Sequence, residues 1–359
     1  MGIKTEISWT DSTWSPIRVR VKADAAEIAS AKGCTSLVEI AGKMAGRVGQ
    51  HCEHVSPGCE HCYAETNNHR CLPANGTGLP YDRRSRDLVE AFVDEKALLQ
   101  PLKWRTVQIP REPGSFTIYE DRLRRIFVEN QSDLFGEWVS DEMIDRVFAV
   151  MALCPQHIYQ LLTKRSARML AYISDTKPHG MGLGRDVVTR IADINSVAPV
   201  EIRHRWPLPN VWLGVSPVDQ PTADALIPLL LKTPAAVRYV SCEPLLGPVD
   251  MWKVDVPARW SAECGQYAGW DWHDFTGQTP GGIDQIIVGG ESGPGARPMH
   301  PDWARSLRDQ CTAASVPYFF KQWGEMYPCN DGDGFKRIGK KAAGALLDGH
   351  EWKQFPEPR

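Results

Sequence analysis

Three cysteines within eleven residues are the feature of this chain most able to do chemistry. Cys52, Cys59 and Cys62 are separated by six and then two residues, and Pro57 and Gly58 between them favour a tight turn. Such a turn allows three thiolates to face one centre. A 4Fe-4S cluster held by three thiolates keeps one iron open, and that iron can bind a small molecule through nitrogen and oxygen donors.

A zinc site is the main alternative for the same cysteines. Zinc in a structural site takes four ligands in a tetrahedron. The fourth ligand could come from one of five nearby residues, namely His51, His54, His61, His69 or Cys71. If Cys71 is a ligand, the site is closed and structural. A chance group of thiols without a metal is a third interpretation, which the scarcity of cysteine and the tight turn disfavour.

The composition indicates a globular protein. The 359 residues, of which 42% are hydrophobic and 24% charged, suffice for a sizeable core and exclude disorder and collagen-like repeats. Because 41 Lys and Arg nearly balance 44 Asp and Glu, a nucleic-acid partner would need a local basic patch. The chain has no apolar run of about eighteen residues and no signal peptide at its start, which predicts no membrane partner and a cytoplasmic location.

A repeated unit positions the polar residues: a short apolar strand, then polar side chains, then a helix. A strand is expected at 6–10, and six further strand runs begin at Arg125, His157, Val211, Val237, Gln285 and Pro317. Helices are expected between several of them, at 140–152, 166–172, 222–231 and 301–313. This rhythm predicts an α/β fold, a partial or distorted (βα) barrel with about six or seven parallel strands.

The same rhythm predicts one barrel domain over residues 1–330. Segments without it are interpreted as insertions near 17–50, 180–205 and 251–282, and residues 331–359 as a C-terminal appendage.

Polar residues follow several of the expected strands. In βα barrels the active site forms at the carboxyl ends of the strands, so we expect four catalytic candidates to converge there: Glu243, Glu291, Lys164 and Lys321. Each glutamate could accept hydrogen bonds from an ammonium or a ribose. The alternative is a structural ion pair with Arg297, Lys321 or Lys164. Asn130 and Ser132 could hydrogen-bond a cofactor, although such residues also begin helices.

Basic residues gather at 83–86, 122–125 and 336–341. With thirteen tryptophans available for stacking, a nucleic-acid groove is conceivable, but such clusters are more often solvated surface.

Several motifs together carry a resemblance. They are WTDSTWSP, CEHVSPGCEHCYAE, LLTKR, VWLGVS, VSCEPLLGP, VGGESGPGARPMHPDW and FFKQWGE, which lie between Trp9 and Glu325. In this combination the chain resembles the family of phage and bacterial three-cysteine-motif proteins whose barrel is similar to that of radical S-adenosylmethionine enzymes. The usual radical enzyme has three residues between its first two cysteines and an aromatic before the third, whereas this chain has six residues and His61.

The resemblance implies Cys52, Cys59 and Cys62 as ligands of a 4Fe-4S cluster and S-adenosylmethionine as a cofactor cleaved to a 5′-deoxyadenosyl radical. Expected cofactor contacts are Tyr63, Asn130, Ser132, Glu243 and Glu291. The expected partners are an electron donor, either a reductase, a flavodoxin or a ferredoxin, and a nucleic-acid base or nucleotide as substrate. The alternative is a non-catalytic zinc- or cluster-stabilised barrel that binds nucleic acid and acts with a partner protein.

Overall fold

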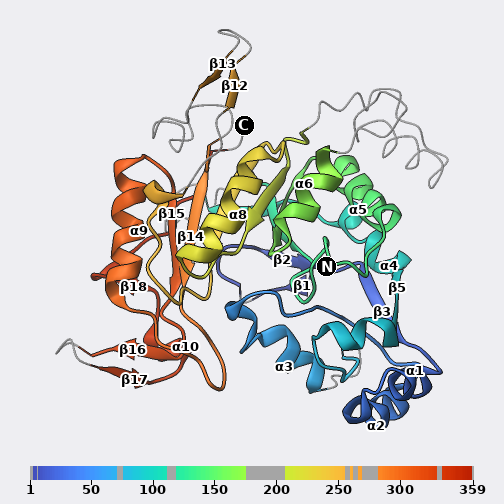
Figure 1. Cartoon of the computed structure of the whole chain (residues 1–359). Coiled ribbons are helices and arrows are strands. Elements are labelled where there is room, and N and C mark those ends of the chain that lie inside the picture. The colour runs from blue at the N-terminus through green and yellow to red at the C-terminus, as the bar shows by residue number, and fades with distance from the viewer. Residues whose placement is uncertain are drawn as a thin grey trace. The chain divides into compact units, whose positions relative to one another are not determined.

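A computed structural model of the protein describes residues 3–5, 7–70, 76–110, 119–174, 207–254, 259–261, 266–268, 282–329 and 334–357. Its main sheet is built from parallel strands with one antiparallel edge strand, β1, and the strand order is β1-β2-β8-β9-β10-β11-β14-β15. Figure 1 shows its strands β14 and β15 side by side. The predicted α/β class and partial (βα) barrel are therefore confirmed. The strands are β1 (Ile3–Lys4), β2 (Ser12–Trp14), β8 (Arg124–Val128), β9 (His157–Thr163), β10 (Val211–Val215), β11 (Val237–Cys242), β14 (Gln285–Gly289) and β15 (Tyr318–Gln322).

Burial explains why the apolar runs form these strands. Every residue of β10, β11 and β14 is buried, as expected for parallel strands covered on both faces. The strand expected at 6–10 is wrong, because the described residues there form a turn in which Thr10 N–H donates to Ile7 O at 3.2 Å. The first parallel strand begins at Ser12 instead and pairs with β8.

The expected helices form close to their predicted bounds, and side chains cap the first turns of α5, α8 and α9. They are α5 (Asp141–Leu153), α6 (Ser166–Ser174), α8 (Gln220–Lys232) and α9 (Pro301–Ala313). The Ser140 hydroxyl accepts from Met143 N–H at the start of α5, and Asp219 and Thr222 form a capping box at the start of α8. These caps satisfy backbone N–H groups at the starts of α5 and α8.

The chain divides into two compact units. The first comprises residues 1–54, 64–161 and 175–212, and the second comprises 55–63, 162–174 and 213–359. Strands β9 and β10 each begin in the first unit and end in the second. The domain boundaries expected from the sequence stay a prediction, and the insertion expected at 180–205 lies outside the described residues.

A second, smaller sheet lies in the first unit. It has the order β4-β3-β5, from β3 (Ile17–Val21), β4 (Val48–Gly49) and β5 (Val89–Val93). Helices α1 (Ala25–Ala31) and α2 (Thr35–Met44) connect β3 to β4, so the segment interpreted as an insertion at 17–50 forms two strands and two helices around a core that includes Val19 and Leu37. The other elements of this unit are α3 (Tyr63–His69, whose first residue belongs to the second unit), η2 (Arg83–Leu88), α4 (Glu95–Leu98), η3 (Pro101–Lys103), β6 (Val107–Pro110) and β7 (Tyr119–Arg122).

In the second unit the C-terminal segment covers the open edge of β15. Phe320 N–H donates to Trp352 O at 2.8 Å, and Gln354 N–H donates to Tyr318 O at 3.1 Å. An exposed edge strand is a template for aggregation, so this cover protects the sheet. The remaining elements are η1 (Pro57–Cys59), η4 (Met251–Lys253), β12 (Arg259–Ser261), β13 (Gln266–Ala268), β16 (Met326–Pro328), β17 (Phe335–Arg337), α10 (Lys340–Ala343), β18 (Leu346–Leu347) and β19 (His350–Glu351).

Within the described ranges, no helix combines the length and the apolar character that crossing a membrane requires.

Candidate functional site

Polar side chains at the carboxyl ends of four strands of the second unit are linked to one another. Lys164, after β9, donates to the Ser216 hydroxyl at 3.2 Å, and that hydroxyl, after β10, donates to the backbone carbonyl of Glu243 at 3.3 Å. The Glu243 carboxylate, after β11, forms an ion pair with Lys321 near the end of β15. Three of the four predicted catalytic candidates are thus brought together, with Ser216 between them.

The turn that carries Cys59 and Cys62 also belongs to the second unit. Cys59 N–H donates to Ser56 O at 3.0 Å and closes the short helix η1. A Cβ on Gly58 would lie 2.6 Å from Val218 and 3.4 Å from Pro244, so the turn packs tightly on the segments that follow β10 and β11. Two of the three cysteines therefore lie at the end of the sheet where barrel enzymes build their active sites.

The fourth catalytic candidate, Glu291, has a different environment. Its side chain is 4% exposed, and both carboxylate oxygens accept hydrogen bonds from the Arg297 guanidinium, at 2.5 and 2.9 Å. The structural ion pair considered for Glu291 is therefore present. Tyr63, a predicted cofactor contact, begins α3 and is about half exposed.

Three other candidates belong to the first unit. The thiol of Cys52 lies 3.9 Å from the backbone carbonyl of Glu53. Ser132 donates to the carbonyl of His51 at 2.6 Å, and Asn130 Oδ1 accepts from the Ser15 hydroxyl at 3.2 Å. Ser132 therefore holds the backbone directly before Cys52, while the proposed cofactor contacts of Asn130 and Ser132 stay predictions.

Sequence reasoning missed Glu129, which follows the apolar residues of β8. Its side chain is 2% exposed, its backbone has the left-handed φ of 54°, and Oε1 accepts from Ile17 N–H at 2.8 Å. Burial, with a smaller effect of the nearby Asp133, raises the pKa of this carboxyl to about 8. The hydrogen bond from Ile17 and the charge of Arg18 lower the pKa but do not outweigh burial. An acid directly after an apolar strand was the signal that identified Glu243 and Glu291, and it would have identified Glu129 too.

The buried Glu129 makes stability depend on pH. Its pKa is 4.5 in its ordinary state and about 8 when folded, so between these values the unfolded chain loses a proton that the folded chain keeps. The contribution that protonated Glu129 makes to the free energy of unfolding is fully present below about pH 4.5 and is lost as the pH rises through 8. Glu129→Gln is expected to match the wild type near pH 4.5 and to be more stable by about 5 kcal/mol at pH 9.

Urea unfolding at pH 5, 7 and 9 measures this effect. Glu90→Gln, at an exposed position on β5, is the matched control and is expected to follow the wild type at every pH. A stability difference for Glu129→Gln that stays the same from pH 5 to pH 9 would contradict the prediction.

The donor set fits a thiolate-bound metal group by its chemistry. Cys52, Cys59 and Cys62 are all partly exposed, and thiolates are the ligands of iron–sulfur clusters. In the described part of the chain, no group of three or more His, Cys, Asp or Glu side chains is arranged to hold a metal ion. Since Cys52 belongs to the first unit and the other two to the second, the three-cysteine group stays a prediction.

The alternative zinc ligands have the following surroundings. His51 is buried, and its ring lies edge-on to that of Trp138. His54 and His69 both approach the Glu65 carboxylate, at 2.8 and 3.5 Å. His61 packs against Gly295, and Cys71 lies outside the described residues.

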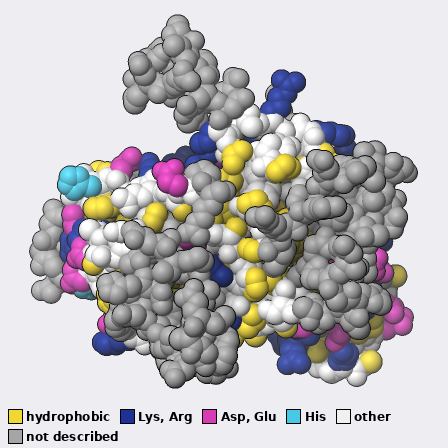
Figure 2. Space-filling model, turned by 90° about the horizontal axis from the view of Figure 1, so that it is seen from above, with side chains coloured by type: hydrophobic (Ala, Val, Ile, Leu, Met, Phe, Trp, Pro, Cys, Tyr) yellow, Lys and Arg dark blue, Asp and Glu magenta, His cyan; other side chains and the backbone are white. Residues whose placement is uncertain are grey.

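Acidic neighbours pair with some residues of each basic cluster. Arg84 pairs with Asp82 at 2.6 Å, and Arg122 pairs with Asp11 at 2.7 Å. Arg86 donates to the Glu53 carboxylate at 2.6 Å. Arg86 and the nearby His51 ring, whose Nε2 lies 3.8 Å from Glu53 Oε1, lower the pKa of Glu53 to about 2 although burial opposes this. Figure 2 shows basic and acidic side chains interspersed over the described surface that it presents. In the third cluster Arg337 pairs with Glu325 at 3.8 Å, so each of the three clusters contains an ion pair.

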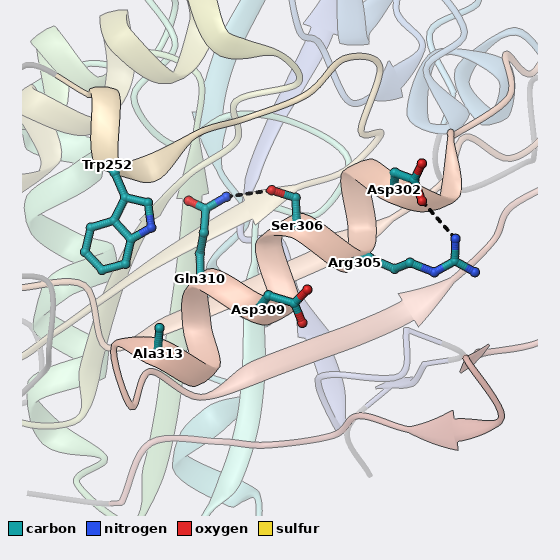
Figure 3. Close-up of a pocket in the computed structure, with 7 residues that line it drawn as sticks. All are labelled: Trp252, Asp302, Arg305, Ser306, Asp309, Gln310 and Ala313. Carbon is teal, nitrogen blue, oxygen red and sulfur yellow. Dashed lines mark hydrogen bonds and ion pairs between the residues drawn. The ribbon is translucent and has the colours of Figure 1, made fainter.

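A shallow groove of about 570 Å³ lies in the second unit between η4 and α9 (Figure 3). Its polar groups pair with one another: Arg305 with Asp302 at 2.9 Å, and Gln310 with Ser306 at 3.0 Å. The other lining residues are Trp252, Asp309 and Ala313. None of the predicted site residues lines this groove, so the strand ends remain the candidate site.

Comparisons with known proteins give one family. The model of the family described as "Protein of unknown function (DUF5131)" matches residues 46–356. No curated protein and no solved structure gives a significant match.

Proposed function

The chain belongs to the DUF5131 family, and within this family of unknown function we propose that it is an iron–sulfur enzyme that reductively cleaves S-adenosylmethionine. One observation carries the proposal: the turn bearing Cys59 and Cys62 packs, through Gly58, on the residues that follow β10 and β11, the same strand ends that present Ser216 and Glu243. A metal-binding turn and polar residues at the active end of a barrel suit a cofactor enzyme.

In this proposal Cys52, Cys59 and Cys62 hold a 4Fe-4S cluster. When bound, the cluster supplies the electron that cleaves the sulfonium of S-adenosylmethionine to methionine and a 5′-deoxyadenosyl radical. The electron comes from a reductase, a flavodoxin or a ferredoxin. Because such thiols must stay reduced, we propose a cytoplasmic location.

Glu243 is the residue best prepared to bind a polar ligand. Lys321 pairs with its Oε1, whereas Oε2 has no hydrogen-bond partner among the described residues, and the side chain is 20% exposed. A carboxylate held on one side by an ammonium can accept a hydrogen bond on the other from an amino group or a ribose hydroxyl. The anchored Lys321 and Ser216 then fix the direction in which Glu243 points.

The proposed substrate is a nucleic-acid base or a nucleotide. Its support is the third basic cluster, where Lys336, Lys340 and Lys341 are exposed and have no acidic partner in the described part of the chain. Unpaired lysines of this kind attract phosphates.

Anaerobic purification followed by metal analysis tests the proposal. We expect brown protein with about four irons and four sulfides per chain, and release of 5′-deoxyadenosine on addition of dithionite and S-adenosylmethionine. Faster release with added oligonucleotide or nucleotide would support the substrate class. Colourless protein with one zinc per chain would overturn the enzyme and favour the alternative, a zinc-stabilised nucleic-acid-binding barrel.

A further inference from the structure

Arg297 joins two segments of the second unit that are far apart in the sequence. Its guanidinium binds the Glu291 carboxylate at the end of β14, as described above. On its other side Nη1 donates to the Glu60 carboxylate at 2.7 Å, and Nη2 donates to the carbonyl of Pro57 at 3.0 Å. Pro57 and Glu60 both belong to the turn that carries Cys59 and Cys62.

Burial and several hydrogen bonds hold the contact between Arg297 and Glu291 in place. The Glu291 side chain is almost fully buried, and its Oε2 also accepts from the backbone N–H of Arg297 at 2.8 Å. A bidentate arginine–carboxylate pair has a defined direction as well as strength. Glu291 therefore fixes the orientation of the guanidinium that reaches the turn.

A second contact joins the same loop to the same turn. Gly295 has a φ of 78°, and a Cβ there would lie 2.9 Å from the ring of His61. The loop from Glu291 to Arg297 thus passes directly against the residue before Cys62, and it does so at a position that favours glycine in conformation and in space.

We propose that Arg297 is a positioning residue that clamps the cysteine turn to the carboxyl end of β14 through Glu291. Glu291 then acts as the anchor of the clamp, because the oxygens expected to contact a cofactor are occupied by Arg297. The inference deepens the proposed function and rests on it for the role of the turn as a cluster site. The clamp itself is a property of the chain without metal.

Hydrogen exchange of reduced, EDTA-treated protein tests the clamp directly. In Arg297→Gln, the amides of the 55–63 peptide are expected to exchange about tenfold faster, because charge-assisted hydrogen bonds to the turn are lost. Arg297→Lys keeps the charge but not the fork of donors and should give a smaller increase. Glu60→Gln removes one outer contact and should also give a smaller increase.

Arg305→Gln is the matched control, since Arg305 is ion-paired with Asp302 and Asp348 on the same unit but does not touch the turn. It is expected to leave the 55–63 peptide unchanged. Exchange of the β11 peptide 237–242 reports whether a variant loses stability as a whole. If Arg297→Gln is folded and its 55–63 peptide exchanges at the wild-type rate, the clamp is wrong.

Experiments on the iron-reconstituted protein distinguish a failure of the clamp from a failure of the proposed function. After anaerobic reconstitution, Arg297→Gln is expected to hold less iron than the wild type and to show an altered electron paramagnetic resonance spectrum of the reduced cluster, while Arg305→Gln matches the wild type. Wild-type protein that binds no iron, together with faster exchange in Arg297→Gln, overturns the proposed function and leaves the clamp standing. Iron in the wild type, together with unchanged exchange in the variant, overturns the clamp and leaves the proposed function standing.

Discussion

Replacing either Cys59 or Cys62 by alanine is expected to reduce the iron bound after anaerobic reconstitution from about four to less than one per chain. Release of 5′-deoxyadenosine should fall by more than about 100-fold, because the loss of a direct ligand exceeds the 10- to 100-fold loss typical of changes around it. Iron and sulfide assays with chromatography of the nucleoside products measure both effects. Cys52→Ala is expected to behave in the same way.

Cys34→Ala is the matched control for these variants. Cys34 is also partly exposed, but it lies outside the cysteine motif, before α2. Its replacement should leave the iron content and the nucleoside release at wild-type levels. Full iron content in Cys59→Ala or Cys62→Ala would remove that residue from the ligand set and with it the three-thiolate site.

Gly290→Ala is expected to lower the free energy of unfolding by about 3 kcal/mol or more. A Cβ at this position would lie 1.9 Å from the carbonyl oxygen of Trp323 and 2.6 Å from its carbonyl carbon. A Cβ on Gly324 would likewise lie 2.1 Å from the backbone carbonyl oxygen of Glu291. Since both neighbours are backbone atoms, neither can move aside without displacing β14 or the end of β15.

Gly334→Ala provides the comparison for this glycine. A Cβ there meets no described atom within 4 Å, and its backbone is not left-handed, so the stability of Gly334→Ala should lie within about 0.5 kcal/mol of the wild type. Thermal or urea unfolding of both variants measures the contrast. Equal stabilities of Gly290→Ala and Gly334→Ala would show that the two backbones separate easily. The expected loss of stability in Gly290→Ala would show that glycine at the end of β14 allows the two backbones to pack closely.

Local patterns in the sequence determined most of the secondary structure. Continuous apolar runs such as 285–289 predict strands buried on both faces, and Pro301 marks the start of α9 because proline suits a first helical turn. The turn at Pro57 and Gly58 was predicted because proline and glycine favour tight turns. These features depend on neighbouring residues, so one sequence suffices to find them. The strand expected at 6–10 failed because turn hydrogen bonds there outweigh its weak strand pattern.

The tertiary structure decided which partner each candidate side chain meets. The sequence offered Arg297, Lys321 and Lys164 as ion-pair partners for either glutamate; the fold pairs Glu243 with Lys321 and Glu291 with Arg297. It also buries Glu129 while leaving Tyr63 exposed. Pairing and burial depend on residues up to hundreds of positions away, as between Arg297 and Glu60, and no local pattern encodes such distances. The sequence therefore named the chemical groups, and the packing of strand ends and loops assigned them to ligand binding or to support.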